Sequence, residues 1–365
     1  MKKIAFVCES LSYGGMERVI NVLSSNLIEN YNIDIIVTTD TKPSSYNNDN
    51  RIKSIYLNSN KSKFKLFNKV NKIFSLKKYI ENSDYDLFIC FGFKVCMSML
   101  LNKKYKNKIV ISERTDPDSY CSKFIKKIRN ILYKRAKMMI CQTEYVKNYY
   151  ENVGLKNCVV IPNPIKDNLP KRFENERRHV VVNFCRLNPQ KNLKLLIDSF
   201  EIFHKSFNDY RLIIYGEGEL EKELKEYIVI KKLEDYVCIE GFQKNIHDLI
   251  IDAKMFVSSS DYEGISNSML EALAIGMPSI CTDCPVGGAS LAIKSYENGI
   301  LVPPKDMSAL SQAMIEVAGN DALSEKLSRN SVSIRDRFSS KKIAETWKCI
   351  IDNIIEEGGS KWRKK

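Results

Sequence analysis

Short apolar runs that alternate with amphipathic helical patterns restrict the fold of this chain more than any other feature. In the first half, the strand-like runs are KIAFVCES, NIDIIVTTD, YDLFICFG, KIVISER and MMICQTE, and a helical pattern over 14–30 follows the first of them. Parallel strands need crossover connections, and these are usually helices that cover the sheet. The alternation therefore predicts an α/β domain with a parallel sheet between two layers of helices.

The second half repeats this plan, which indicates two domains of one architecture. Its strand-like runs are HVVVNFCRL, YRLIIYGEG, YVCIEGF, KMFVSSS, PSICTD and GILVPP. The charged stretch 166–178, with prolines nearby, predicts an interdomain linker. We therefore predict domains at 1–168 and 169–340, and a last amphipathic helix within 341–365. Ligands of open parallel sheets bind beyond the carboxyl ends of the strands, so we expect the site among those loops, in a cleft between the domains.

The composition is that of a soluble globular protein. Apolar residues make up 44% and charged residues 28% of the chain, and no run of about 18 apolar residues predicts a membrane span. The start, MKKIAFVCES, reads as a strand rather than a signal peptide, so we expect a cytoplasmic protein whose 11 cysteines are reduced. Cys281 and Cys284 form a single CxxC pair, and the three histidines are not spaced to complete a zinc site.

The net charge of +13 is concentrated in the first half. Residues 1–168 contain 29 Lys and Arg against 15 Asp and Glu, whereas the rest of the chain is close to neutral. Two stretches, 61–78 and 122–137, combine many lysines with apolar residues at helical spacing. Such helices are typical of contact with an anionic membrane surface, although ordinary surface helices with lysines on the wet face remain an alternative. No nucleic-acid-binding module is recognisable, so we expect no nucleic acid partner.

Three features of the second half fall at predicted strand ends. Arg186 and Lys191 follow the first strand, close to a helix start, where two cations suit a phosphate or diphosphate. Gly216 and Gly218 follow the next strand and allow close backbone approach, but the spacing is not that of a dinucleotide fingerprint. Taken alone, the fragment with Arg186 and Lys191 fits a solvated basic loop slightly better than a phosphate site.

The third feature is DYEGISNSMLEAL, in which Glu263 and Glu271 lie eight positions apart across a strand–loop–helix junction. Ser266 or Asn267 can cap the helix, so free N–H groups and the positive end of the helix dipole face the loop. A carboxylate accepts two hydrogen bonds from vicinal hydroxyls. Glu271 therefore suits a ribose, and Glu263 suits hydroxyls beyond the phosphates. Together with the cations, the pair predicts a nucleotide-sugar site.

The first half contributes Gly14 and Gly15, between the first strand and the first helix. Glycines there let a phosphate or another backbone approach, although a simple tight turn explains them equally well.

At this point the sequence resembles the retaining glycosyltransferases of family 4, which have the GT-B fold of two Rossmann-like domains. The motifs that carry the resemblance, in chain order, are GGMERV, RLNPQKN, YGEGEL, EGISNSMLEALAIGMPSICTD and ENGILVPP. Two further motifs, ISERTDP and VIPNPI, look like those of members that build bacterial surface polysaccharides. The resemblance covers most of the chain. It implies that the last helix crosses back to the first domain.

The resemblance also implies roles for individual residues. Arg186 and Lys191 would bind the donor diphosphate, Glu263 the donor sugar, and these three would be the catalytic residues, while Glu271 would bind the ribose. Further donor contacts would come from Gly14, Gly15, Gly216, Gly264, Ile265, Ser266 and Asn267. Transfer would retain the anomeric configuration without a metal or other cofactor. Asp116 and Asp118 form a DxD pair, which is interpreted as coincidental in this fold.

The chain departs from the family in one respect, because many relatives carry a histidine near the acceptor in the first domain. No histidine precedes His179 in this sequence, and Glu113, Arg114 and Asp116 are the candidates for that region.

The leading hypothesis is therefore a hexosyl- or N-acetylhexosaminyltransferase that uses a nucleotide sugar, with uridine as the expected base. Its acceptor would be a saccharide on a lipid diphosphate at the inner face of the cell membrane. A nucleotide-sugar epimerase of the same architecture would need no acceptor. A noncatalytic membrane-surface scaffold would not need to keep the two cations and two glutamates.

Overall fold

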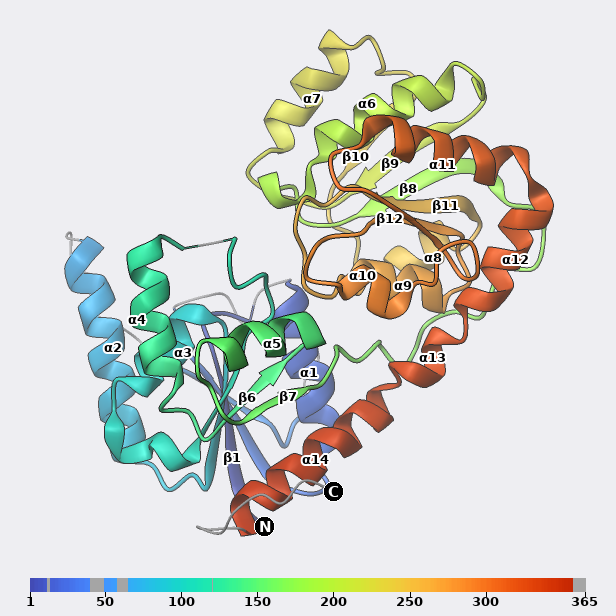
Figure 1. Cartoon of the computed structure of the whole chain (residues 1–365). Coiled ribbons are helices and arrows are strands. Elements are labelled where there is room, and N and C mark those ends of the chain that lie inside the picture. Colours follow the sequence, from blue (N-terminus) through green and yellow to red (C-terminus); the bar gives the residue numbers. More distant parts are fainter. Residues whose placement is uncertain (12–13, 40–48, 58–64, 120, 357–365) are drawn as a thin grey trace. The chain divides into compact units, whose positions relative to one another are not determined.

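The computed structural model of the chain describes residues 1–11, 14–39, 49–57, 65–119 and 121–356, with only the backbone for 65–70. The chain forms two compact units, shown in Figure 1. Unit 1 comprises residues 1–164 and returns at Ser340, and unit 2 comprises residues 165–339.

Unit 1 is built on a parallel sheet of seven strands in the order β3-β2-β1-β4-β5-β6-β7. The strands are β1 (Lys3–Cys8), β2 (Asn32–Val37), β3 (Lys53–Tyr56), β4 (Leu87–Phe91), β5 (Ile109–Ser112), β6 (Met138–Cys141) and β7 (Cys158–Val160). The helices are α1 (Gly15–Leu27), α2 (Lys65–Glu81), α3 (Phe93–Leu100), η1 (Lys103–Lys108, 3-10), α4 (Lys123–Tyr133), α5 (Glu144–Asn152) and α14 (Ser340–Glu356). The central strands are buried on both faces, which is why they read as continuous apolar runs.

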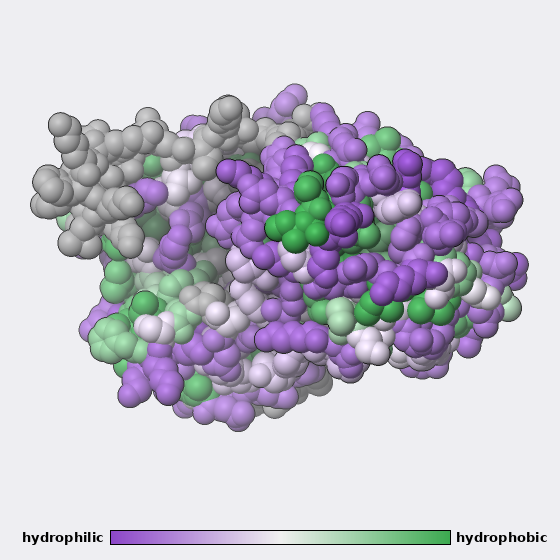
Figure 2. Space-filling model, turned by 90° about the horizontal axis from the view of Figure 1, so that it is seen from above, coloured by the Kyte–Doolittle hydropathy of each residue, from purple (hydrophilic) through white to green (hydrophobic). Residues whose placement is uncertain are grey.

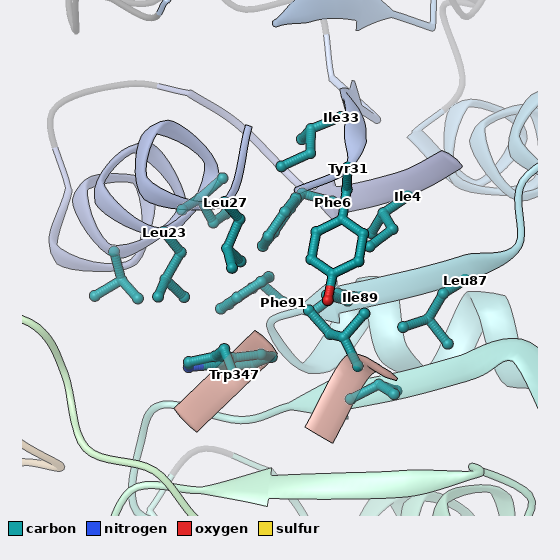
Figure 3. Packing of buried hydrophobic residues seen from close by; sticks show 14 of the residues in the cluster. Ile4, Phe6, Leu23, Leu27, Tyr31, Ile33, Leu87, Ile89, Phe91 and Trp347 are labelled. Carbon is teal, nitrogen blue, oxygen red and sulfur yellow. The ribbon is translucent and has the colours of Figure 1, made fainter. Parts of the chain in front are cut away.

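Helix α14 belongs to the core of unit 1 although it follows unit 2 in the sequence. The Trp347 ring is fully buried and stacks on Phe91, with 6.2 Å between the ring centroids. Figure 3 shows Trp347 near Phe91 and Phe6, against Leu23 and Leu27 of α1. Tyr31 donates a hydrogen bond of 2.6 Å to Asp352 Oδ1 at the far end of the helix. Isoleucines at helical spacing on α14 therefore complete a core that the strands and earlier helices of unit 1 leave open.

Unit 2 has a parallel sheet of six strands in the order β10-β9-β8-β11-β12-β13. The strands are β8 (Arg178–Phe184), β9 (Arg211–Tyr215), β10 (Val237–Glu240), β11 (Ala253–Ser258), β12 (Ser279–Thr282) and β13 (Ile300–Val302). The helices are η2 (Pro189–Lys191, 3-10), α6 (Leu193–His204), α7 (Glu221–Ile230), α8 (Ile246–Ile250), α9 (Asn267–Ala274), α10 (Gly288–Ala292), α11 (Met307–Gly319), α12 (Asp321–Ser331) and α13 (Ile334–Arg337). Two parallel-sheet α/β domains were predicted, and the structure confirms this fold class.

Local sequence explains several helix boundaries. Ser266 caps α9 by accepting a hydrogen bond from the Met269 N–H, so Ser266 rather than Asn267 is the cap. Gly276 ends the same helix in the left-handed region, with φ of 73°, where a glycine adds no steric cost.

No helix of the described ranges is long and apolar enough to cross a bilayer. The predicted basic helix at 61–78 corresponds to α2, which begins at Lys65, and the side chains of 65–70 lie outside the described residues. The second basic stretch corresponds to α4.

Candidate functional site

The candidate site of unit 2 is built from the loops that follow β8 and β11, which are neighbouring parallel strands. Side chains join the two loops. Gln190 donates to the Tyr262 carbonyl at 2.8 Å, and Asn192 Nδ2 donates to Asp261 Oδ1 at 2.7 Å. The Asp261 N–H returns a bond to the Gln190 carbonyl. These contacts fix the spacing between the residues that each loop carries.

Lys191 and Glu263 meet at this junction. Lys191 Nζ donates to Glu263 Oε2, and Ser260 Oγ donates to the same oxygen at 3.1 Å. Burial lowers the pKa of Lys191, but the Glu263 carboxylate more than offsets this effect and the pKa is raised. The Lys191 ammonium and the Glu263 carboxylate are thus mostly buried and neutralise each other. The Ser260 hydroxyl holds the Glu263 carboxylate in place.

Arg186 lies on the same loop as Lys191, directly after β8. Its side chain is exposed and has no hydrogen bond or ion pair with any residue that the structure describes. An exposed guanidinium beside a buried ammonium can bind two oxygens of an anionic ligand at once. The structure therefore keeps one cation of the predicted pair open to solvent.

The glycines after β9 are required by the backbone of the neighbouring loop. Gly216 has φ of 145°, and a Cβ on it would overlap the Cys185 carbonyl oxygen. A Cβ on Gly218 would overlap the Leu187 carbonyl oxygen in the same way. Gly216 therefore brings the loop after β9 against the loop that carries Arg186, and its contact with a donor stays a prediction.

The segment Gly264–Asn267 leads into α9. Gly264 and Ile265 are buried, and a Cβ on Gly288 of α10 would overlap the Gly264 carbonyl oxygen. The loop after β11 is thus pressed between Gly288 on one side and the Lys191 loop on the other. This packing places Glu263 close to the N-terminus of α9.

Glu271 lies on α9 and is almost completely buried. The Nε2 atom of His247, which comes from α8, is 3.1 Å from Glu271 Oε2, although this nitrogen completes no hydrogen bond within the described residues. Sequence reasoning missed His247, because nothing in the pattern NIHDLIIDA shows that α8 faces α9. A whole strand, β11, separates the two residues in the chain, so no helical periodicity connects them.

In unit 1, Gly14 and Gly15 lie at the start of α1, after the carboxyl end of β1. Gly14 is the N-cap residue in an extended conformation, and the helix has no side-chain cap hydrogen bond. Ser10 Oγ donates to Glu17 Oε1 at 2.9 Å, which ties the loop to the first turn of the helix. The glycine turn is confirmed as the link between β1 and α1, and donor contact at this turn stays a prediction.

Glu113 follows β5 and points into unit 1. Its Oε2 accepts a hydrogen bond from Tyr150, while Oε1 is buried without a hydrogen-bond partner among the described residues. Burial raises the pKa of Glu113 to about 7, even though Arg129 and Tyr150 act in the opposite direction. As a fully covered carboxyl, it is placed to hold the interior of unit 1 rather than to meet an acceptor from solvent.

Arg114 binds the segment that leaves unit 1. It donates to Ser112 Oγ at 2.9 Å and to Asn163 Oδ1 at 2.6 Å, and its guanidinium lies 5.9 Å from the centre of the Trp347 ring. Burial lowers the pKa of Arg114 to about 9.

Asp116 and Asp118 lie in a tight turn after Arg114. Asp116 Oδ1 accepts from the Asp118 N–H at 2.9 Å, and Asp118 forms an ion pair with Lys126. Each of these carboxylates thus has a structural partner. No group of three or more potential metal-ligating side chains is present in the described part of the chain. Cys281 and Cys284 are free, buried thiols.

Helix α4 presents apolar side chains to solvent. Arg129, Leu132 and Tyr133 face the unit, whereas Phe124 is 72% and Ile131 is 62% exposed. Apolar side chains of this kind are visible among polar ones at the left of the view in Figure 2. An ordinary surface helix turns its apolar side chains toward the protein core and exposes only polar ones. Helix α4 exposes apolar side chains as well, so it differs from an ordinary surface helix whose exposed face carries only lysines.

Comparison with known proteins places each half of the chain in a described family. The model "Glycosyltransferase Family 4" matches residues 13–169, and the model "Glycosyl transferases group 1" matches residues 164–333. The chain is 27% identical over 310 residues to the poly(ribitol-phosphate) α-N-acetylglucosaminyltransferase of Staphylococcus aureus. That match covers 82% of this chain but 62% of the relative, which is less than two thirds of its length.

A second relative matches along its whole length. It is a Campylobacter jejuni α-1,4-N-acetyl-D-galactosaminyltransferase named for a diphospho-undecaprenol-linked acceptor, 26% identical over 361 residues, with 97% of this chain and 99% of the relative covered. Among solved structures, Anabaena HepE in complex with UDP and glucose superposes with a TM-score of 0.84 at 18% identity, covering 96% of this chain and all of that one. The chain thus consists of two regions that match glycosyltransferase family models in succession, a Family 4 region followed by a group 1 region, and it has the GT-B fold.

Proposed function

We propose that this glycosyltransferase moves a hexose or N-acetylhexosamine from a UDP-sugar to a lipid-linked saccharide, with retention of the anomeric configuration. The product would enter a bacterial surface polysaccharide or glycan. The observation that carries the proposal is the contact between Lys191 and Glu263, which joins the loop that carries the exposed Arg186 to the loop that leads into α9. Cations and a hydroxyl-binding carboxylate in one place fit a sugar joined to a diphosphate.

In the proposed complex, Arg186 and Lys191 contact the diphosphate, and Glu263 turns to the hydroxyls of the sugar. Glu271 binds the ribose. The bond between the anomeric carbon and the phosphate oxygen breaks, and the bond to the acceptor oxygen forms on the same face. The acceptor proton passes to the departing phosphate, whose charge the two cations and the helix dipole stabilise. No residue of unit 1 is needed as a base, which is consistent with the absence of a histidine there.

Two observations support a lipid-linked acceptor at a membrane surface. The Campylobacter relative is named for such an acceptor. In addition, the excess positive charge lies in unit 1, where α4 exposes Phe124 and Ile131 among lysines. A basic helix with an outward apolar face fits an anionic bilayer, so we place the protein at the cytoplasmic face of the cell membrane without a membrane span.

The identity of the donor is tested by incubating the protein with a panel of nucleotide sugars. The assay measures which nucleotide sugar releases free nucleotide and whether this release needs an acceptor. We expect Lys191→Ala and Glu263→Ala each to lower transfer by about 10²–10³-fold, because each removes charge from the reacting centre. Lys194→Ala is the matched control, since its ion pair with Glu223 lies on the surface one turn further along. Full activity in both site variants would reject the assignment, and turnover without any acceptor would favour an epimerase.

Membrane contact is tested by sedimentation with vesicles of phosphatidylcholine and phosphatidylglycerol. We expect binding that weakens as salt is added, because it depends on lysine charge. Phe124→Ser should weaken binding further at high salt, where apolar insertion supplies most of the remaining affinity. If binding were the same for neutral and anionic vesicles, the membrane part of the proposal would be wrong.

A further inference from the structure

A groove of about 300 Å³ lies between α2, α3 and η1 of unit 1. Its volume is at the lower end of the range of about 300–1,000 Å³ that is usual for ligand sites. The residues that form it come from the last two turns of α2, the end of α3 and the 3-10 helix that follows. The groove lies wholly within unit 1, so it depends on no arrangement of the two units.

The floor of the groove is apolar and buried. Leu76 and Ile80 of α2 face Met99 of α3 and Ile109 at the start of β5, and all four side chains are at most 4% exposed. Spacings of three and four residues put Leu76, Ile80 and the upstream Ile73 on one face of α2. An unbranched hydrocarbon would therefore find apolar contacts along the groove, whereas a sugar or nucleotide would leave its polar groups unpaired.

The rim carries positive charge. Lys77 and Lys103 line the groove, and the carboxylate of Glu81 lies next to it, where it accepts a hydrogen bond from Asn102 at 3.4 Å. Lys77 has one weak partner, Glu81 at 3.9 Å, and both side chains are solvent-exposed. Lys103 forms no ion pair with any described residue, and Lys104, Lys106 and Lys108 follow it on η1. The rim can therefore bind a phosphate without breaking a strong internal contact.

Exposed apolar side chains continue from the mouth of the groove to the surface. Leu101, which lines the groove, is 52% exposed, and Phe74, next to Ile73 of the groove on α2, is 68% exposed. Tyr105 lines the same opening and packs edge-on against the buried Phe88. Aromatic and aliphatic side chains among lysines are characteristic of the region where a protein meets lipid headgroups.

The groove lies at the amino end of β5, whereas the predicted acceptor-side residues follow the carboxyl end of this strand. Ile109, at the amino end of β5, lines the groove, whereas Glu113 and Arg114 follow the carboxyl end of the same strand. Four residues of extended strand separate these ends by roughly 13 Å. A ligand in the groove would thus lie away from the loop that carries Glu113 and Arg114.

We propose that this groove binds one acyl chain of an anionic membrane phospholipid, with the lipid phosphate at Lys77 and Lys103. The charge of the rim selects an anionic headgroup, and the dry floor selects a hydrocarbon chain. A bilayer lipid bound in this way anchors unit 1 in addition to the contact made by α4. This proposal rests on the proposed membrane association, but not on the transfer reaction.

The first experiment places a fluorescent reporter at the mouth of the groove. Leu101→Trp is made in full-length protein that also carries Trp362→Phe, so the buried Trp347 is the only other indole. Vesicles contain phosphatidylglycerol brominated in mid-chain, and bromine quenches an indole that it touches. We expect strong quenching of the new tryptophan, whereas Val229→Trp, an equally exposed position on α7 of unit 2, should not be quenched.

The second experiment either fills the groove with a larger side chain or removes the positive charge of its rim. Ser98→Phe fills it from α3 and should abolish quenching at position 101 while vesicle binding through α4 persists. Lys77→Gln with Lys103→Gln should weaken binding to phosphatidylglycerol vesicles by roughly thirtyfold, since each lysine near an anionic surface contributes a factor of about five. The control Lys222→Gln with Lys326→Gln removes the same charge from exposed positions on unit 2 and should change little.

Each contrary result overturns the groove proposal in a recognisable way. Vesicle binding without quenching at position 101 would show surface adsorption with an empty groove. Equal weakening by the two lysine pairs would show nonspecific attraction. If a mass measurement showed a dimer, and the tryptophan at position 101 were shielded from solvent in it, a second copy of the chain would be the occupant of the groove. If the wild-type protein bound no anionic vesicles, the membrane association itself would fail, while nucleotide release would still test the transfer function.

Discussion

At the scale of single residues, burial of charged side chains has different effects at two places, the Lys191–Glu263 pair and Glu113. Lys191 and Glu263 form a mostly buried ion pair, and the Glu263 carboxylate raises the pKa of Lys191 in spite of burial. Glu113 is also close to a cation, Arg129, but burial outweighs the attraction and its pKa rises. The first arrangement is poised to exchange partners with a ligand, and the second holds its surroundings together.

This difference predicts a pH effect on stability. The pKa of Glu113 rises from 4.5 to about 7 on folding, so the folded state holds a proton that the unfolded chain has already released. Stability from this group is present below pH 4.5 and is lost as pH rises through 7. The loss is on the order of 3 kcal/mol.

The measurement is the free energy of unfolding in urea, across this pH range, for wild type and Glu113→Gln. The variant has no proton to lose, so the difference between the two proteins should change with pH. Glu144→Gln, at the surface of α5, is the control. A difference that does not vary with pH would show that Glu113 ionises normally.

The sequence placed Lys191 and Glu263 in one candidate site because both follow the carboxyl ends of predicted parallel strands, but it did not predict their direct contact. It did not predict Asn192 in the left-handed region, with φ of 43°, or its bond to Asp261. Such contacts depend on the conformation of two loops that are far apart in the chain, which neither loop determines alone.

At the scale of elements, Gly288 of α10 sets the position of the loop that carries Glu263. Gly288→Ala introduces a Cβ that overlaps the Gly264 carbonyl oxygen, so the loop with Glu263 must move. We expect a loss of about 1–3 kcal/mol in stability from this overpacking and a larger fractional loss of transfer. Thermal unfolding and initial rates measure the two effects.

Gly241→Ala is the matched control, because a Cβ there meets nothing within 4 Å. Gly288→Ala with normal rates would mean that the loop can shift without consequence for the proposed site.

Helices and strands were predicted correctly from the sequence where an apolar run was long and separate. They were missed where one apolar run continued into the next, or where a strand was short. Helix α3 was not predicted, because FKVCMSML is apolar on most sides and follows β4 directly, with only Gly92 between them. Strand β3 was missed because its four residues lie at the sheet edge and none is fully buried. Edge elements bury less surface, so the sequence places fewer apolar residues there.

At the scale of the whole molecule, unit 2 is an insertion within unit 1. The core of unit 1 needs α14, and Trp347 is its largest fully buried side chain. Trp347→Ala should therefore reduce the stability of unit 1 by about 3–5 kcal/mol. Hydrogen exchange of amides in β4 should become faster, whereas amides in β11 should keep their protection.

Trp347→Phe keeps an aromatic ring against Phe91 and should retain most of the protection in β4. If amides of both units lost protection from hydrogen exchange equally in the alanine variant, the two units would unfold together. Helix α14 would then not stabilise unit 1 alone.

The late position of α14 also has a consequence for synthesis on the ribosome. The seven strands of unit 1 emerge first, but the helix that closes their core arrives only after all of unit 2, Ile165–Ser339, has been translated. At about 5–20 residues per second, the uncovered face waits for roughly 10–35 s. During that interval the nascent chain exposes a hydrophobic surface large enough to engage chaperones, so the yield of native enzyme should depend on how quickly translation reaches Ser340.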